Sequence, residues 1–145
     1  MHMPIRPATR RGQVAGRRQG FAAFKLFGGE RMILISDSMR ATGMADGAYT
    51  LGGLDVDVKG NRATLADGTL AGSVTNLMDC MRTAVSMGIP LETAVRCATY
   101  NPAKSIGVEA LHGRIADGAH GDCVLLSRAD LSVQEVILGG EIVKK

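Results

Sequence analysis

The pattern of hydrophobic and polar positions first singles out a short stretch near residue 35. Residues 32–35 are four consecutive apolar side chains, two of them β-branched, and Ser36, Asp37 and Ser38 follow at once. Such a run, ended by small polar residues, predicts a strand buried on both faces, as in a parallel sheet. Catalytic groups gather at the carboxyl ends of parallel strands, so Asp37 is a candidate general base. The commoner role of an aspartate at this position is to cap the following turn, and the residues alone leave both open.

The pattern then changes to short alternating runs. Leu54, Val56 and Val58 alternate with charged residues, and turn pairs such as Gly60-Asn61 and Asp67-Gly68 separate the runs. This alternation predicts a small antiparallel meander with one apolar face over residues 46–71. It reads as a β excursion between a core strand and the helix that should follow it.

Helical periodicity appears after this meander. Apolar positions between 74 and 87 trace a stripe that Gly88 ends, and a second helix is expected from Pro90 to about residue 98. Pro102 interrupts the run, and a short turn ends at Gly107. Residues 122–126, 133–138 and 141–143 are predicted strands, with a Gly139-Gly140 turn between the last two.

The N-terminal part differs from the rest of the chain in composition and charge. Residues 21–27 are dense in apolar side chains and precede Gly28-Gly29, which suits the last turns of a helix with a glycine cap. Residues 1–20 are rich in arginine and glycine without any period, and we expect them to be disordered. Residues 1–31 hold seven basic side chains and one acidic one, whereas the other 114 residues hold ten basic and thirteen acidic ones. A nucleic-acid surface over the whole protein is therefore not supported, and any such role would rest on the basic tail.

Composition excludes several classes of protein. The 145 residues suit one domain, no apolar run is long enough to span a membrane, and the N-terminus lacks the apolar core of a secretory signal, so we expect a cytoplasmic protein. Three widely spaced cysteines without a CxxC pair indicate reduced thiols. Among motifs for metals, serine hydrolysis and nucleotides, HxH, HExxH, GxSxG, the Walker loop and GxGxxG are all missing.

Several blocks together resemble a known family. They are ILISDSMRATGMADGAYTLGG (33–53), DGTLAGS (67–73), NLMDCMRTAV (76–85), GIPLETAVRCATYNPAKSIG (88–107) and GRIADGAHGDCVLL (113–126). In order and spacing they are similar to the C-terminal portion of the N-acetylglucosamine-6-phosphate deacetylases, which are metal-dependent amidohydrolases. The resemblance runs from about Phe21 to the C-terminus. It implies an α/β fold, the C-terminal fragment of a (β/α)8 barrel with part of a small β-sandwich.

The resemblance also implies a division of the chain. Residues 1–20 do not resemble the family, residues 21–108 would be the C-terminal part of the barrel with the β insertion at 46–71, and residues 109–145 would be returning strands of the sandwich. Residues 32–36 would be the last barrel strand.

The same resemblance assigns roles to particular residues. Asp37 matches the family's catalytic aspartate, which takes a proton from a metal-bound water and returns it to the departing amine. Leu70, Ala71 and Gly72 match a segment that contacts the sugar. The implied reaction converts N-acetylglucosamine 6-phosphate into glucosamine 6-phosphate and acetate.

The family's metal ligands have no counterpart here. A divalent metal, zinc or iron, is expected for the complete enzyme, but its glutamate and two histidines come from earlier barrel strands, so we expect this chain alone to bind no metal and to be inactive. The complete enzyme is expected to be a homo-oligomer that acts on an amino-sugar phosphate, without nucleic-acid or membrane partners. The alternative to catalysis is an association module that pairs through an exposed barrel edge.

Overall fold

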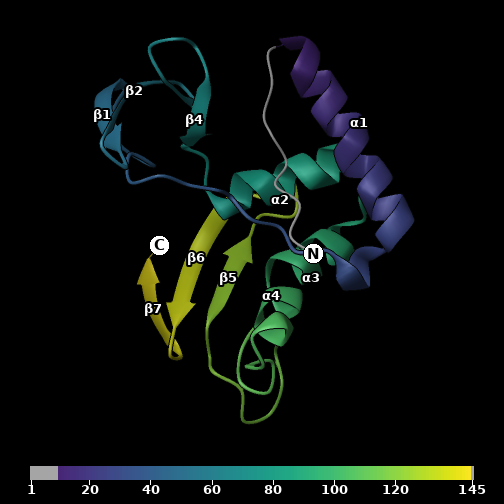
Figure 1. Cartoon of the computed structure of the whole chain (residues 1–145). Helices are drawn as coiled ribbons and strands as arrows, with labels where there is room; N and C mark the ends of the chain where they lie inside the picture. The colour runs from purple at the N-terminus through teal and green to yellow at the C-terminus, as the bar shows by residue number, and fades with distance from the viewer. Residues whose placement is uncertain (1–9, 145) are drawn as a thin grey trace.

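The computed structural model describes residues 10–144, which form four α-helices and two antiparallel sheets. In Figure 1 the first sheet lies at the upper left and the second at the lower left, the helices between residues 77 and 105 lie in the middle of the view, and the first helix runs along its right side. Within this part of the chain, no helix is long and apolar enough to cross a membrane.

Helix α1 (Arg10–Phe27) opens the described chain and corrects one expectation. Residues 10–20 were expected to be disordered, but they form the first part of this helix; residues 1–9 lie outside the described residues. The predicted glycine cap is confirmed, since Gly28 has φ 71° and its N–H donates to the Phe24 carbonyl at 2.9 Å. A 3-10 turn, η1 (Gly29–Arg31), follows.

Residues 32–37 cross from α1 to the first sheet as a chain without regular secondary structure (Figure 1). The strand predicted over residues 32–36 does not form here: the segment forms no ladder with any strand in residues 10–144. Its attachment includes a hydrogen bond from the Leu34 N–H to the Cys97 carbonyl at 2.9 Å. Apolar character alone does not make a strand, because a ladder needs a neighbouring strand to pair with.

The first sheet contains the meander that the alternation predicted over residues 46–71, but its last strand runs on to Ser73. Its strands pair in sequence order: β1 (Gly47–Leu51), β2 (Leu54–Lys59), β3 (Arg62–Thr64) and β4 (Leu70–Ser73). Val56 and Val58 are each 2% exposed, and the charged residues that alternate with them face solvent. Together with Met39, Ala41 and Ala63 they form a hydrophobic cluster on one face of the sheet. This cluster fixes the sheet against the chain that follows Asp37.

The helices form a second cluster. Helix α2 (Leu77–Ser86) begins at Asn76, whose side chain accepts from the Asp79 N–H at 2.9 Å; α3 (Leu91–Ala98) and α4 (Tyr100–Ser105) follow. The buried residues of this cluster are Met81 and Ala84 of α2, Ile89 of the connection that follows it, and Ala94 of α3. Phe21 and Phe24 of α1 and Leu34 of the crossing segment pack against them.

The last part of the chain is the second sheet, in the order β5 (Cys123–Leu126), β6 (Val133–Leu138) and β7 (Glu141–Lys144). These bounds confirm the three predicted strands to within one residue. The guanidinium of Arg82, on α2, donates to the Leu131 carbonyl at 2.7 Å, and the side chains of Leu126 and Leu131 pack against the helical cluster. These contacts attach the sheet to the helices.

Candidate functional site

Asp37 lies where the crossing segment meets the first sheet. Its side chain is exposed, and its backbone has φ 53°, a left-handed conformation that is uncommon for a residue with a side chain. Asparagine and aspartate tolerate this region best, yet it still has a cost that the surrounding contacts must offset. The carboxylate of Asp37 therefore lies in a turn whose backbone conformation is held by surrounding contacts, at the end of the crossing segment.

Two backbone hydrogen bonds join this turn to β4. The Ser73 N–H donates to the Asp37 carbonyl at 3.2 Å, and the Met39 N–H donates to the Ser73 carbonyl at 2.8 Å. They form an isolated parallel bridge between Ser38 and Ser73. The end of β4 therefore lies directly beside Asp37, although 36 positions separate Asp37 from Ser73 in the sequence.

The predicted sugar-contacting residues lie on the same strand. Leu70, Ala71 and Gly72 are the first three residues of β4, and all three are partly exposed. A Cβ added at Gly72 would lie 3.8 Å from the Met39 Cβ, so this glycine is in close contact with the chain that follows Asp37. The structure thus brings the two sets of predicted site residues together.

The pairing of β4 is irregular at the site. Ala63 pairs with Gly72 and Thr64 pairs with Leu70, so the register shifts by one residue at Ala71. Such irregularities re-aim side chains and are frequent beside active sites. The Ala71 side chain packs against the hydrophobic cluster of the sheet, so a ligand would meet the backbone of this residue.

A group of small hydroxyl side chains lies beside the turn, and no sequence motif predicts it. The Ser38 Oγ donates to the Thr75 carbonyl at 2.5 Å, and the Ser73 Oγ lies 2.6 Å from the Thr75 Oγ1. The Thr75 N–H donates to the Ser73 Oγ at 3.1 Å. The signal in the sequence is only that serine and threonine are frequent at positions 36–38 and 73–75, which by itself is typical of any turn.

A thiol lies beside these hydroxyl side chains. The Cys80 Sγ is 3.8 Å from the Thr75 Oγ1. Burial raises the pKa of the Cys80 thiol above its ordinary value, and the nearby Asp79 acts in the same direction, against the hydrogen bond from Thr75. A thiol held in its protonated form is a poor nucleophile, so Cys80 is a poor candidate for a nucleophile at this site.

The side chains present do not fit a metal ion. Among residues 10–144, no group of three histidine, cysteine, aspartate or glutamate side chains is arranged to hold one. A catalytic metal needs about three protein ligands, and Asp37 alone does not supply them. His112 and His120 stack face to face with ring centroids 4.6 Å apart, in the loop between α4 and β5.

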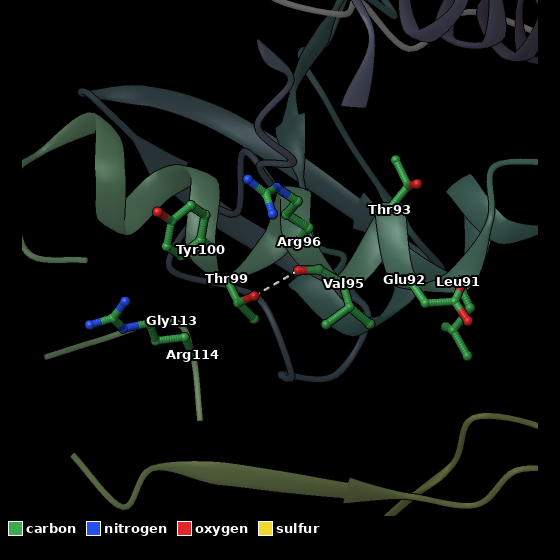
Figure 2. A pocket seen from close by; sticks show the side chains of 9 residues that line it. All are labelled: Leu91, Glu92, Thr93, Val95, Arg96, Thr99, Tyr100, Gly113 and Arg114. Atoms are coloured by element: carbon green, nitrogen blue, oxygen red, sulfur yellow. Dashed lines mark hydrogen bonds between the residues drawn. The ribbon is translucent and has the colours of Figure 1, made fainter. Parts of the chain in front are cut away.

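An open groove on α3 and α4 lies apart from the predicted site residues. Figure 2 shows the side chains that line it, which are Leu91, Glu92, Thr93, Val95, Arg96, Thr99, Tyr100, Gly113 and Arg114. Arg96 is already engaged, since it lies 4.7 Å above the Tyr100 ring and forms an ion pair with Glu30 at 2.6 Å. The groove contains none of the residues predicted to act on substrate.

Comparison with known proteins identifies relatives of this chain. The chain is 38% identical over 116 residues to the N-acetylglucosamine-6-phosphate deacetylase of Vibrio furnissii, covering 79% of this chain and 29% of that protein. It is 35% identical over 114 residues to a putative N-acetylgalactosamine-6-phosphate deacetylase of Escherichia coli K12, covering 78% of this chain and 68% of that protein. The chain thus spans about three-tenths of the length of the Vibrio furnissii relative.

Solved structures give the same result in three dimensions. The N-acetylglucosamine-6-phosphate deacetylase of Thermotoga maritima superposes with a TM-score of 0.82 and 34% identity, over 89% of this chain and 35% of that one. Residues 30–143 match the profile of the amidohydrolase family, a range that includes Asp37, all of β4 and both sheets except Lys144. Because this match covers about four-fifths of its length, this chain belongs to the amidohydrolase family.

Proposed function

We propose that this chain takes part in the hydrolysis of the acetamide group of N-acetylglucosamine 6-phosphate, which gives glucosamine 6-phosphate and acetate. The observation that carries the proposal is the placement of Asp37 beside Leu70, Ala71 and Gly72 in a chain of the amidohydrolase family. Relatives named for this activity, at 34–38% identity, support it. Another relative is named for the galactosamine isomer, which differs from glucosamine in configuration at C4, so the proposal does not extend to the configuration at that carbon.

Asp37 would be the acid–base group of this reaction. Its exposed carboxylate can accept a proton from the water that attacks the acetamide carbonyl, and it can then return the proton to the departing amine nitrogen. The backbone of residues 70–72 would hold the sugar, because an irregular strand that contains a glycine lets a ligand approach the main chain closely. A divalent metal, zinc or iron, belongs to the family's chemistry, but the described residues offer it no ligand set.

The proposal includes the architecture of the complete enzyme. Residues 21–108 would be the C-terminal part of a (β/α)8 barrel, in which residues 32–36 become the last barrel strand once neighbouring strands flank them. Residues 109–145 would complete a small β-sandwich. A cytoplasmic location and a homo-oligomeric complete enzyme belong to the same proposal.

A chimera tests this function. Residues 30–143 would replace the matching portion of the Vibrio furnissii deacetylase, which supplies the rest of the enzyme, and acetate release from N-acetylglucosamine 6-phosphate would be measured. We expect turnover by the chimera, and a loss of roughly 10²- to 10⁴-fold in kcat for Asp37→Asn, the range typical of a general acid–base group. Asp117→Asn, in an exposed loop, is the matched control. Equal turnover by the Asp37→Asn chimera would contradict the assignment.

The second candidate function is self-association through the crossing segment. The observation that favours it is the exposure of Ile33 and Ile35, at 39% and 50%, on a segment that pairs with no strand of the described part of the chain. Unpaired extended backbone with apolar side chains is a template for pairing with another strand. Sedimentation velocity of the chain and of Ile35→Lys separates the cases, because association through this edge would be lost in the variant, whereas a monomeric wild-type chain would exclude it.

A further inference from the structure

We propose that Ser38 is a positioning residue for Asp37, whose hydroxyl ties the turn at the carboxylate to the start of the α2 region. The proposal deepens the proposed function and rests on it, because it takes Asp37 as the acid–base group. The juxtaposition that carries it is the 2.5 Å hydrogen bond from the Ser38 Oγ to the Thr75 carbonyl, one residue from Asp37 and one residue before the Asn76 cap of α2.

The backbone conformation of Asp37 needs support from outside its own segment. Residues 32–37 form no ladder with another described strand, so the usual means of fixing a residue at a strand end is missing on this segment. Asp37 also has a left-handed backbone, which persists only where surrounding contacts over-determine it. The direction of its carboxylate therefore depends on what holds residues 37–39.

Two backbone hydrogen bonds and one side-chain hydrogen bond hold this turn. On the backbone, the Asp37 carbonyl accepts from Ser73 at 3.2 Å and the Met39 N–H donates to the Ser73 carbonyl at 2.8 Å. On the side chain, Ser38 adds the only direct link from this turn to Thr75 among the described residues. Both backbone hydrogen bonds go to Ser73, so the turn could still rotate about the end of β4. The third hydrogen bond goes to Thr75 and restricts that rotation.

Thr75, whose carbonyl accepts the hydrogen bond from Ser38, is itself held in place. Thr75 is held by its own N–H and Oγ1, both of which contact the Ser73 Oγ, at 3.1 and 2.6 Å. The next residue, Asn76, caps α2 through a 2.9 Å bond to the Asp79 N–H. The hydroxyl of Ser38 thus connects Asp37 to the N-terminal end of a packed helix. Placement of catalytic groups within fractions of an ångström matters, since a displacement of about 1 Å can cost a factor of about 10² in rate.

The first arm of the test uses the whole 145-residue chain and needs no activity. Amide hydrogen exchange, followed by NMR, reports the two backbone bonds of the turn at the Met39 and Ser73 amides. We expect Ser38→Ala to raise both exchange rates about five- to tenfold, the effect of losing one hydrogen bond on a local opening. Ser38→Thr keeps the hydroxyl and should restore the protection.

The matched control is Ser105→Ala. The Ser105 Oγ also donates to a backbone carbonyl, that of Pro102, at 2.7 Å, and it lies on α4 away from the turn. This variant should leave the Met39 and Ser73 amides unchanged. Unchanged protection in Ser38→Ala, or an equal loss in Ser105→Ala, would overturn the proposal.

The second arm separates a positioning role from a merely structural one. In the chimera described above, Ser38→Ala should lower kcat by roughly 10- to 100-fold and leave KM within about twofold, because the variant displaces the reacting group and not the sugar contacts. Normal turnover with unchanged kcat in Ser38→Ala would overturn the positioning role alone. Absence of turnover in the wild-type chimera would instead overturn the proposed function, and the exchange arm would still decide whether Ser38 holds the turn.

Discussion

The Nδ2 of Asn101 donates a hydrogen bond of 2.6 Å to the carbonyl oxygen of Met32. A second bond of 2.6 Å from the same nitrogen reaches the Gly29 carbonyl, and Asn101 is only 5% exposed. One buried amide on α4 therefore fixes both ends of η1 and the start of the segment that leads to Asp37. The Oδ1 of this amide is buried without a partner among the described side chains and backbone, so its donor side accounts for the observed bonding.

Replacing Asn101 should destabilise the chain. We expect Asn101→Ala to lower the free energy of unfolding by about 2–3 kcal/mol, because the partly buried carbonyls of Gly29 and Met32 each lose a hydrogen bond from the amide. Asn101→Asp should cost more, because an ionised carboxylate is an acceptor only and would face two carbonyl oxygens. Urea denaturation measures both, with the exposed Gln134→Ala as the control, expected to change the free energy by less than about 0.5 kcal/mol. A stability of Asn101→Asp equal to that of wild type would contradict this account.

Gly113 offers a test of close backbone approach. A Cβ at this position would lie 2.6 Å from the Thr99 carbonyl oxygen, and the residue has φ 76°. Gly118 has nearly the same φ, 78°, but no atom within 4 Å of its ideal Cβ. Gly118→Ala should thus cost only the backbone strain, about 1–2 kcal/mol, whereas Gly113→Ala should cost at least about 2 kcal/mol more. Thermal denaturation of the two variants compares them directly, and equal losses would show that the loop moves freely away from Thr99.

The thiols of Cys80 and Cys97 should resist modification. Burial raises the pKa of both, so each forms less thiolate in the folded chain than in the unfolded one. In a Cys123→Ser background, we expect Ellman's reagent to react with these two cysteines at least about tenfold more slowly in buffer than in urea, because the thiolate is the reactive form. Rapid reaction of either cysteine in buffer would show that α2 or α3 opens on the timescale of the assay.

Asp130 should titrate well below the ordinary range. Hydrogen bonds from the Ser132 backbone and hydroxyl, and from Ser127, lower the pKa of Asp130 to about 2. Because the folded-state pKa is depressed, the contribution of this carboxylate to stability is full above about pH 4 and is lost as the pH falls through about 2. An NMR titration of the Asp130 carboxyl should give a midpoint near 2. The Asp130→Asn variant should lose less stability than wild type between pH 4 and pH 2, and an identical acid limb would contradict the assignment.

Local patterns predicted those elements whose partners are close in sequence. The alternation around Val56 and Val58, with turn residues between the runs, was sufficient for the meander, since each strand pairs with the next. Gly28 marked the end of α1 for a similar reason, because a cap depends on the last turn of its own helix. The resemblance of several blocks led to the amidohydrolase family, which the profile match over residues 30–143 confirms.

Features that depend on distant partners were not predicted. The run at residues 32–35 has the apolar character of a buried strand. Whether it pairs depends on a neighbouring strand, and a local sequence pattern carries no information about such a neighbour. The helix over residues 10–20 was missed because arginine-rich sequence without a period gives no amphipathic signal. The contacts of Ser38 and Asn101 span 37 and 69 positions respectively, so their residue types indicated only turns and helix ends. The assignments of Asp37 and residues 70–72 to the reaction remain predictions.

The chain between Leu34 and Met39 joins the two hydrophobic clusters of the molecule, because Leu34 packs with the helices and Met39 packs with the first sheet. Asp37 is therefore carried on a connection between two bodies, and it belongs to neither core. A change in the angle between the meander and the helices would therefore move the segment that carries this carboxylate. The relative orientation of the two clusters would thus set the direction of the Asp37 carboxylate, and a ligand that draws the meander toward the helices would reorient it.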